Sequence, residues 1–363
     1  MKLNAGGLSS LVVGREKEIE ILKSYINFSQ HTVIMAPRRY GKTTLANKVL
    51  DELKNEYLIV KVDIFQATNI KELCERYLNA IYKSVGIANF LNEVKQSVLS
   101  FIDKFSLSYE IEGIKIGYEI FRENDENKFI EKTFNFANTF AKLHKKKMLV
   151  FFDEFGDIEK FDQNFIKKIR SYMQTHENIV YLFAGSQTSV INTIFLKKEN
   201  AFFNFASLMK IGFLDKKEAE KFLKSVRIDG KVFNKKVIES IYDITKFHPF
   251  YMIKLMQESF ISSLLEKNKT IRVNDVDNAL KKILNDNNAF FETTWQQINR
   301  KRYKGSIYKQ FCQGKTQINN IDINSSYKSQ LIKELKMESL LSDELNPTDP
   351  FLGLWLTKRN QNV

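Results

Sequence analysis

Short apolar segments alternate with longer amphipathic segments through the first two-thirds of the chain. The short segments are strand length and carry few charges, which is typical of strands buried on both faces of a parallel sheet. The longer segments repeat apolar residues at helical spacing. We predict strands at 31–35, 57–65, 148–152, 179–184 and 208–213, with helices at 43–54, 70–85, 128–146 and 163–175. The pattern therefore predicts an α/β fold in which helices cover both faces of a parallel sheet.

One segment departs from this alternation. Residues 107–111 and 114–118 alternate apolar with polar side chains around Glu112-Gly113. Alternation on both sides of a turn dipeptide predicts a β-hairpin. We expect an insertion at about 106–121 on the edge of the sheet, either as an ordinary edge hairpin or as a contact surface for a partner.

The predicted strands end near residue 213, and helical periodicity continues beyond them. Helices at 216–226, 235–245, 250–266 and 273–284 predict a small helical lid. The last part of the chain has helices, then a helix at 327–336 and a short apolar stretch at 339–345. That order predicts a winged-helix-like domain with its recognition helix at 327–336. The expected units are 1–213, 214–285 and 286–363.

Composition and charge narrow the class of protein. The chain has 363 residues, 43% of them hydrophobic, and no apolar run approaches the roughly 20 residues of a membrane helix, so no integral membrane protein is expected. Cys74 and Cys312 form no metal or disulfide spacing, which favours the cytoplasm. The formal charge of +13 favours an anionic partner such as double-stranded DNA. Solvated lysine-rich helix faces are the alternative interpretation, because the basic runs are short.

The segment Ala36-Pro-Arg-Arg-Tyr-Gly-Lys-Thr43 stands between a predicted strand and a predicted helix. It matches the phosphate-binding pattern G-x-x-x-x-G-K-[ST], except that Ala36 replaces the first glycine. This segment, 36–43, is called the P-loop below. Gly41 lets the backbone approach phosphate oxygens, and the positive helix end attracts them. Lys42 would bind the β- and γ-phosphates, and the Thr43 hydroxyl would bind Mg²⁺. The residues expected to bind ATP here are Ala36, Pro37, Arg38, Arg39, Tyr40, Gly41, Lys42, Thr43 and Thr44.

Two further strand ends carry polar residues. The strand at 148–152 is followed by Asp153, expected in the Mg²⁺ shell, and Glu154, expected to be the general base for an attacking water. The next strand leads into Gly185-Ser-Gln187, where Ser186, with Gln187 as second choice, would sense the γ-phosphate. A simple strand-to-loop turn is the alternative at that position. Together these motifs predict an ATPase that converts ATP and water to ADP and phosphate.

With three further motifs, these segments resemble the archaeal-type ATPase family, which belongs to the STAND branch of the AAA+-related P-loop ATPases and also occurs in bacteria. The further motifs are Val13-Gly-Arg-Glu-Lys-Glu18, His248-Pro249, and the ending Thr348-Asp-Pro-Phe-Leu-Gly-Leu-Trp-Leu356. The resemblance covers nearly the whole chain. It implies that Val13, Gly14 and Arg15 line an adenine pocket, with Arg15 and Glu16 fixing the N-terminal segment. It also implies that His248 and Pro249 close over the nucleotide from the lid.

The chain departs from the family pattern at two places. One is Ala36 in the P-loop. The other is residues 201–210, which contain no arginine where relatives often carry one before the fifth strand. Arg170 is the remaining candidate for an arginine finger that would reach a neighbouring subunit of a nucleotide-dependent homo-oligomer. A surface helix arginine is the alternative.

These observations lead us to expect an ATP-driven molecular switch that binds ATP, ADP and Mg²⁺ and acts on DNA through its winged helix. The alternative is a STAND-type signalling ATPase whose C-terminal domain contacts a protein effector. A kinase that reuses the P-loop is less favoured, because no acceptor-site pattern is present and the Asp153-Glu154 pair suits water as the nucleophile.

Overall fold

The computed structural model describes residues 12–88, 90–92, 108–186, 188–315, 318 and 321–359. Its centre is a five-stranded sheet in the order β2-β3-β4-β1-β5, with every neighbouring pair parallel. The strands are β1 (Thr32–Met35), β2 (Leu58–Asp63), β3 (Met148–Asp153), β4 (Ile179–Gly185) and β5 (Ser207–Lys210). All the predicted strands are confirmed, with small shifts at their ends.

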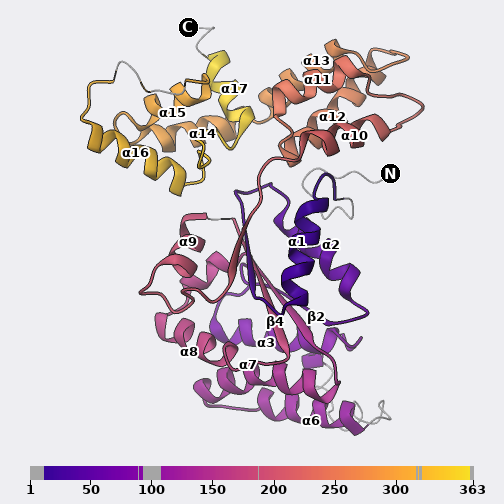
Figure 1. The fold of residues 1–363 in the computed structure, drawn as a ribbon, viewed down its shortest axis with the longest axis vertical. Coiled ribbons are helices and arrows are strands. Elements are labelled where there is room, and N and C mark those ends of the chain that lie inside the picture. The colour runs from indigo at the N-terminus through magenta and orange to yellow at the C-terminus, as the bar shows by residue number, and fades with distance from the viewer. Residues whose placement is uncertain are drawn as a thin grey trace.

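Helices cover both faces of the sheet, as predicted (Figure 1). One face packs against α1 (Glu16–Asn27) and α2 (Lys42–Leu53) in a core that includes Ile34. The opposite face packs in a second core that includes Val33. Its helices are α3 (Ile70–Lys83), α7 (Glu126–Leu143), α8 (Gln163–Met173) and α9 (Thr188–Leu196). Adjacent residues of a strand point to opposite faces, so Val33 and Ile34 each enter a different core.

The predicted hairpin at about 106–121 is wrong. Its described residues form one helix, α6 (Ser108–Phe121), which packs against α7; Leu107 lies outside the described residues. The buried positions of α6 are Gly113, Ile114, Gly117 and Ile120. This spacing of three and four residues defines one face of a helix. The apolar residues that suggested a strand therefore also fit one face of a helix. The segment forms the helix because that face packs against α7.

Two glycines let α6 approach its neighbours closely. A Cβ added to Gly117 would lie 2.0 Å from the hydroxyl oxygen of Tyr82 and 2.9 Å from Cζ of Phe90. The Tyr82 hydroxyl donates a 2.6 Å hydrogen bond to the carbonyl oxygen of Gly113. A Cβ added to Gly113 would lie 3.3 Å from Cε2 of Phe140. Gly117, and less strictly Gly113, therefore serve close packing rather than backbone freedom.

The described chain beyond β5 is helical apart from isolated bridges, in agreement with the prediction. The segment predicted to be a lid, called the lid below, contains α10 (Lys216–Ser225), α11 (Lys235–Thr245), α12 (Pro249–Leu265) and α13 (Val273–Asp286). Its closing over a nucleotide stays a prediction. The last unit contains α14 (Asn288–Asn299), α15 (Lys304–Cys312), α16 (Ser325–Met337) and α17 (Pro350–Arg359). One continuous hydrophobic cluster runs from Leu214 to Leu356. The lid and the last unit therefore share a core at the end of the molecule where the sheet's carboxyl edge lies (Figure 1).

A short antiparallel bridge joins Leu341 to Pro347 between α16 and α17. A wing would occupy that place after a recognition helix, and the winged-helix assignment stays a prediction. Cys74 and Cys312 are both free thiols. No described helix has the length and apolar character needed to cross a membrane.

The packing of α6 predicts that Gly117→Ala destabilises the protein. The new methyl group must displace Tyr82 or Phe90, and overpacking of this kind costs about 1–3 kcal/mol. Urea unfolding should show a lower midpoint for this variant. Gly212→Ala is the matched control, because nothing lies within 4 Å of its added Cβ. Equal midpoints for Gly117→Ala and the parent protein would contradict the close contact of α6 with α3.

Candidate functional site

The carboxyl ends of β1, β3 and β4 lie beside one another on one edge of the sheet. Strand β4 pairs with both β3 and β1, with Phe152 opposite Phe183 and Met35 opposite Gly185. Ligands of open parallel sheets bind outside the carboxyl ends of the strands. The three predicted motifs, which are far apart in sequence, therefore meet at the edge where a ligand is expected.

The loop after β1 ends in Gly41, which has φ +84° and directly precedes α2. Lys42 begins that helix and is only 6% exposed. Its ammonium group donates to the carbonyl oxygens of Ala36 (2.9 Å) and Pro37 (3.0 Å). Burial lowers the pKa of Lys42 to about 8, while the nearby charges of Glu154 and Asp153 act in the opposite direction. Free amides at the start of α2 and a buried cation together form an anion site.

Thr43 and Asp153 form the oxygen pair predicted for a metal. The Thr43 hydroxyl donates a 2.8 Å hydrogen bond to Oδ2 of Asp153. Burial raises the pKa of Asp153, and this hydrogen bond opposes the rise. No group of three or more His, Cys, Asp or Glu side chains in the described part of the chain could hold a metal. Mg²⁺ needs no such group when phosphates and waters supply its other ligands, so the pair fits a metal that arrives with a nucleotide.

Glu154 and Ser186 are held together at the ends of β3 and β4. The Ser186 hydroxyl and its backbone N–H donate to Oε2 of Glu154 at 2.8 and 3.2 Å. Glu154 has φ +47°, a conformation that non-glycine residues rarely adopt. Such backbone strain concentrates at functional sites. The second-choice residue, Gln187, lies outside the described residues.

Arg15 is buried and ties the P-loop to the segment after β5. Its guanidinium group donates to the carbonyl oxygens of Tyr40 (3.2 Å) and Gly212 (2.5 Å). Its acidic partner is Glu18 at 2.7 Å. Arg15 therefore links the P-loop to the segment after β5. Its place in an adenine pocket and its role with Glu16 in fixing the N-terminal segment stay predictions.

The neighbours of Arg15 contact the lid. Val13 packs against the lid cluster, and Gly14 lies against Leu214 and Glu218. The segment 13–15 therefore joins the P-loop to the lid. Its predicted contact with adenine stays a prediction.

Tyr40 connects the P-loop to the last unit. Its hydroxyl donates a 2.9 Å hydrogen bond to the carbonyl oxygen of Thr348. Its ring stacks on Phe213 and meets His248 edge-on at 4.6 Å. Burial lowers the pKa of His248 to about 3, so its imidazole is neutral at physiological pH. His248 precedes Pro249 at the start of α12 and reaches the P-loop through Tyr40.

Arg39 makes a second set of contacts from the P-loop. Its guanidinium group lies over the rings of Phe250 (4.7 Å) and Phe290 (5.4 Å), which belong to α12 and α14. It also lies 3.5 Å from the Tyr251 hydroxyl, which donates to Asp349 at 2.7 Å. The His248-Pro249 motif and the Asp349-Pro350 motif therefore meet on the P-loop. Sequence reasoning missed Thr348 and Asp349 as site residues, although the C-terminal motif was the available signal.

Arg170 lies away from these groups. Its guanidinium group covers the ring of Phe205 at 4.0 Å and donates to Gln174. Its charge helps lower the pKa of His31, which precedes β1 at the amino end of the strands. The role of Arg170 as an arginine finger that reaches a neighbouring subunit stays a prediction.

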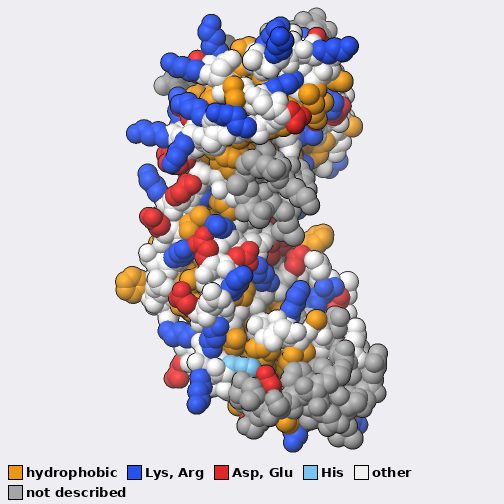
Figure 2. Space-filling model, turned by 90° about the vertical axis from the view of Figure 1, so that its right-hand side faces the viewer, with side chains coloured by type: hydrophobic (Ala, Val, Ile, Leu, Met, Phe, Trp, Pro, Cys, Tyr) orange, Lys and Arg blue, Asp and Glu red, His pale blue; other side chains and the backbone are white. Residues whose placement is uncertain are grey.

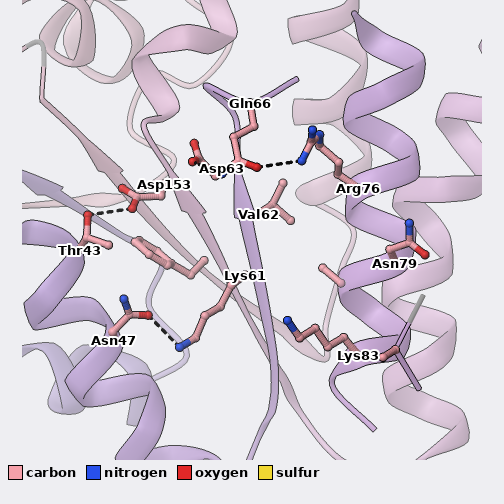
Figure 3. Close-up of a pocket in the computed structure, with 13 residues that line it drawn as sticks. Thr43, Asn47, Lys61, Val62, Asp63, Gln66, Arg76, Asn79, Lys83 and Asp153 are labelled. Carbon is pink, nitrogen blue, oxygen red and sulfur yellow. Dashed lines mark hydrogen bonds between the residues drawn. The ribbon is translucent and has the colours of Figure 1, made fainter. Parts of the chain in front are cut away.

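Two cavities border the site. One of about 440 Å³ is lined by Thr43, Asp153 and Asp63, among others (Figure 3). The other, of about 390 Å³, is lined by Tyr40 and by residues of the last unit that include Pro347 and Thr348. The P-loop therefore has open space on its metal side and on the side of the last unit.

Similar solved structures share this fold at low sequence identity. The Walker-type ATPase PABY2304 of Pyrococcus abyssi has TM-score 0.64 and 14% identity, over 95% of this chain and 96% of that chain. The ORC2 protein of Aeropyrum pernix has TM-score 0.60 and 13% identity, over 99% and 98%. Cdc6p of Pyrobaculum aerophilum has TM-score 0.51 and 11% identity, over 99% and 97%. No curated protein matches the chain.

One family model matches residues 12–255, which is more than half of the chain. The match includes the P-loop, the Asp153-Glu154 pair, Ser186 and the start of α12. The chain therefore belongs to the family described as the ATPase domain predominantly from Archaea.

Proposed function

We propose that the protein binds ATP with Mg²⁺, hydrolyses it, and acts as a nucleotide-driven switch. One observation carries the proposal. At adjacent strand ends beside Lys42, the Thr43 hydroxyl is hydrogen-bonded to Asp153, and the Ser186 hydroxyl is hydrogen-bonded to Glu154. The similar ORC2 structure was determined in ADPNP and ADP complexes, which supports nucleotide binding in this fold.

Each residue has a distinct role in hydrolysis. Lys42 would exchange its two loop carbonyls for the β- and γ-phosphate oxygens. Mg²⁺, held by Thr43 and Asp153, would supply positive charge to the phosphates. Glu154 would orient a water whose oxygen attacks the γ-phosphorus while the bond to the bridging oxygen of ADP breaks. The water's proton passes to Glu154, and Ser186 holds that carboxylate in place.

Glu154→Gln should bind ATP normally and lose turnover by about 10²- to 10⁴-fold, because an amide cannot accept the proton. Turnover is measured by phosphate release and binding by titration with a fluorescent ATP analogue. Asp157→Asn, an acid-to-amide change three residues away, should keep its activity. Lys42→Ala should lose nucleotide binding. Full turnover in Glu154→Gln would show that another group is the base.

We propose that Tyr40 and Arg39 carry the nucleotide state to the other units. Phosphates bound by the loop amides would shift these two neighbouring side chains. They already contact α12, α14 and Thr348. Since the lid and the last unit share one core, they would respond together. A domain movement would follow if these contacts differ between the ATP-bound and ADP-bound states, because local ligand binding then favours one arrangement of the units over the other.

Tyr40→Phe should retain ADP binding but weaken this coupling, because one buried hydrogen bond of about 0.5–1.5 kcal/mol is lost. Hydrogen exchange of residues 339–349, with and without ADP, measures the response. ADP should change exchange there in the parent protein and change it less in Tyr40→Phe. Tyr242→Phe, which removes a hydroxyl from the lid helix α11, serves as control. An unchanged response in Tyr40→Phe would exclude this route.

We propose double-stranded DNA as the partner of the last unit. The two acids nearest the end of α16, Glu334 and Glu338, pair with Lys301 and Lys304 at 2.5 Å. Lys333 of the same helix is exposed. Lys and Arg side chains are also dense over the upper end of the molecule on the face that Figure 2 shows, which is the side where the lid helices lie in Figure 1, so basic charge is not confined to the last unit. These features and the charge of +13 support an anionic partner.

Duplex binding should fall more than about tenfold between 50 and 200 mM salt, because lysine–phosphate contacts release counterions. Fluorescence anisotropy of a labelled duplex, with ATP or ADP, measures this. Lys333→Ala should weaken binding, while Lys235→Ala, on the lid helix α11, should not. If no duplex binds at low salt with either nucleotide, DNA is excluded and a protein effector becomes the expected partner.

A further inference from the structure

Asp63 ends β2 directly beside the Thr43–Asp153 pair. Asp63 and Asp153 are partners in the register of β2 and β3, and the Ile64 N–H donates to the Asp153 carbonyl oxygen at 3.1 Å. Facing residues of neighbouring strands are about 4.8 Å apart and point to the same side. Figure 3 shows both carboxylates at the cavity that Thr43 also lines. A second acid therefore faces the place where the metal is expected.

Both oxygens of Asp63 are fixed but retain capacity to accept further hydrogen bonds. Oδ1 accepts from the Phe65 N–H at 3.0 Å, and Oδ2 accepts from the Gln66 side-chain amide at 2.9 Å. An ionised carboxylate has about four acceptor positions, so two remain. Among the described residues, Asp63 has no ion pair with Lys or Arg. Among these residues, Asp63 therefore has no direct ion-pair partner beside Asp153. Three basic side chains nevertheless line the same cavity, those of Lys61, Arg76 and Lys83.

The chemistry of Mg²⁺ matches this arrangement. Mg²⁺ keeps several water ligands and takes only one or two protein ligands at nucleotide sites. Those waters are hydrogen-bond donors that need acceptors around the metal. A fixed carboxylate one strand away from Asp153 is such an acceptor.

We infer that Asp63 is a positioning residue for the metal, accepting hydrogen bonds from water ligands of the Mg²⁺ that Thr43 and Asp153 hold. The inference rests on the proposed nucleotide site. It adds a third protein group to that site, from the edge strand β2. Asp63 does not touch the phosphates and acts only through the metal's waters.

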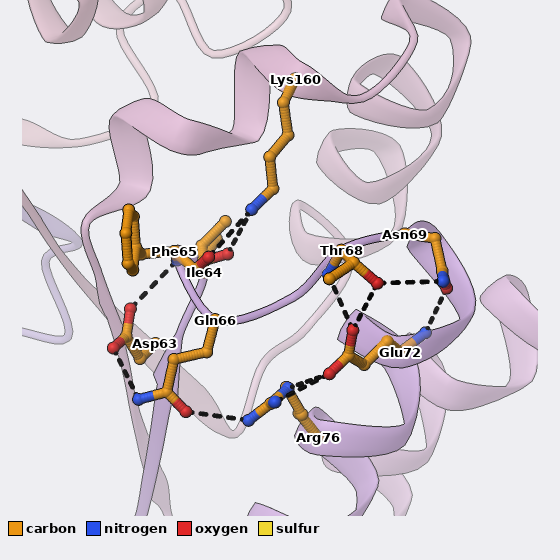
Figure 4. Close-up of polar contacts among 9 residues, drawn as sticks. All are labelled: Asp63, Ile64, Phe65, Gln66, Thr68, Asn69, Glu72, Arg76 and Lys160. Carbon is orange, nitrogen blue, oxygen red and sulfur yellow. Dashed lines mark hydrogen bonds and ion pairs between the residues drawn. The ribbon is translucent and has the colours of Figure 1, made fainter.

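The same carboxylate belongs to a polar network that spans the loop after β2 (Figure 4). The Gln66 side-chain oxygen accepts from Arg76, and Arg76 pairs with Glu72 at 2.7 Å. Glu72 in turn accepts from the N–H and the hydroxyl of Thr68 at 2.8 and 2.7 Å. A shift of Asp63 would therefore move Gln66 and the loop that these bonds hold.

Lys160 braces the loop from the other side. Its ammonium group donates to the carbonyl oxygens of Ile64 (2.9 Å) and Phe65 (3.2 Å). Lys160 ends the short helix that follows Glu154, so the loop is tied to both acidic strand ends. The Phe65 side chain is 68% exposed on this loop. A shift of Asp63 on metal binding at Thr43 and Asp153 should therefore be detectable at Phe65.

The first test compares metal affinity in Asp63→Asn and the parent protein. Mn²⁺ binding to the ADP complex is measured by electron paramagnetic resonance, and ADP binding is measured separately in EDTA. Loss of an outer-shell partner lowers metal affinity by about 10- to 100-fold. ADP affinity in EDTA should stay within about twofold of the parent value, because Asp63 contacts no phosphate. Asp51→Asn is the matched control, since Asp51 lies on α2 and is exposed.

The outcomes separate the two proposals. If the parent protein binds no Mn²⁺ with ADP, both the nucleotide·metal site and the role of Asp63 are wrong. If the parent binds Mn²⁺ and Asp63→Asn binds it equally, only the role of Asp63 is wrong. An equal loss of ADP affinity with and without metal would also overturn it, because that pattern marks a general disturbance of the site.

The second test uses Phe65→Trp as a fluorescence reporter. The signal of Trp295 and Trp355, measured in the parent protein, is subtracted from that of the variant. Mg²⁺ added to the ADP complex should change the fluorescence of this variant. The change should disappear in the double variant with Asp63→Asn and persist in the one with Asp51→Asn. Persistence in the Asp63→Asn double variant would show that the loop does not follow the metal through Asp63.

Discussion

The structure depends on a buried charge that has no strong counter-ion of its own. Lys42 is held at the start of α2 by two neutral carbonyl oxygens, and burial lowers its pKa to about 8. The acids that oppose this shift, Asp153 and Glu154, are bonded to Thr43 and Ser186 instead. A triphosphate would supply the missing negative charge for Lys42 and the helix end, and a divalent cation would balance the acids. Only the two together neutralise the site, which is why nucleotide and metal are expected to bind cooperatively.

The P-loop is also the meeting point of all the units. Arg15 holds its backbone from the N-terminal side, while Tyr40 and Arg39 extend to Thr348, Phe250 and Phe290. The lid and the last unit share one hydrophobic cluster. The sheet domain also contacts the last unit through the packing of α9 on α16 and through the ion pair of Lys210 with Asp343 at 2.6 Å. A change at the P-loop therefore acts on the lid and the last unit together. The hydrogen bond of Tyr40 to Thr348 would contribute about 1 kcal/mol to the free energy of this coupling, the usual value for a neutral hydrogen bond.

The sequence predicted the parts of the fold that depend on local pattern. The positions of the strands follow from short buried apolar segments, and the meeting of Lys42, Asp153, Glu154 and Ser186 follows because the carboxyl ends of parallel strands share one edge. The order of the strands in the sheet was not predicted. The hairpin prediction was wrong because five residues that alternate apolar with polar fit both a strand and one face of a helix. The contacts of Gly117 with Tyr82 favour the helix, and the sequence pattern does not show them. The Tyr40–Thr348 bond joins residues 308 positions apart, and no local pattern encodes such a pair. Asp63 was missed for a related reason, because its relevance arises from the register of β2 with β3.

The replacement of the first P-loop glycine by Ala36 is explained by the backbone. Ala36 is buried, and its contribution to the site is the carbonyl oxygen that accepts from Lys42, which any residue provides. It is absent from the residues with positive φ, so an alanine there carries no conformational strain. Gly41, in contrast, has φ +84° at the position where the chain turns into α2. The loop thus keeps its glycine at the turn into α2, although Arg39 also has a positive φ of +68° without being glycine. The replacement at Ala36 falls where the backbone does not need glycine.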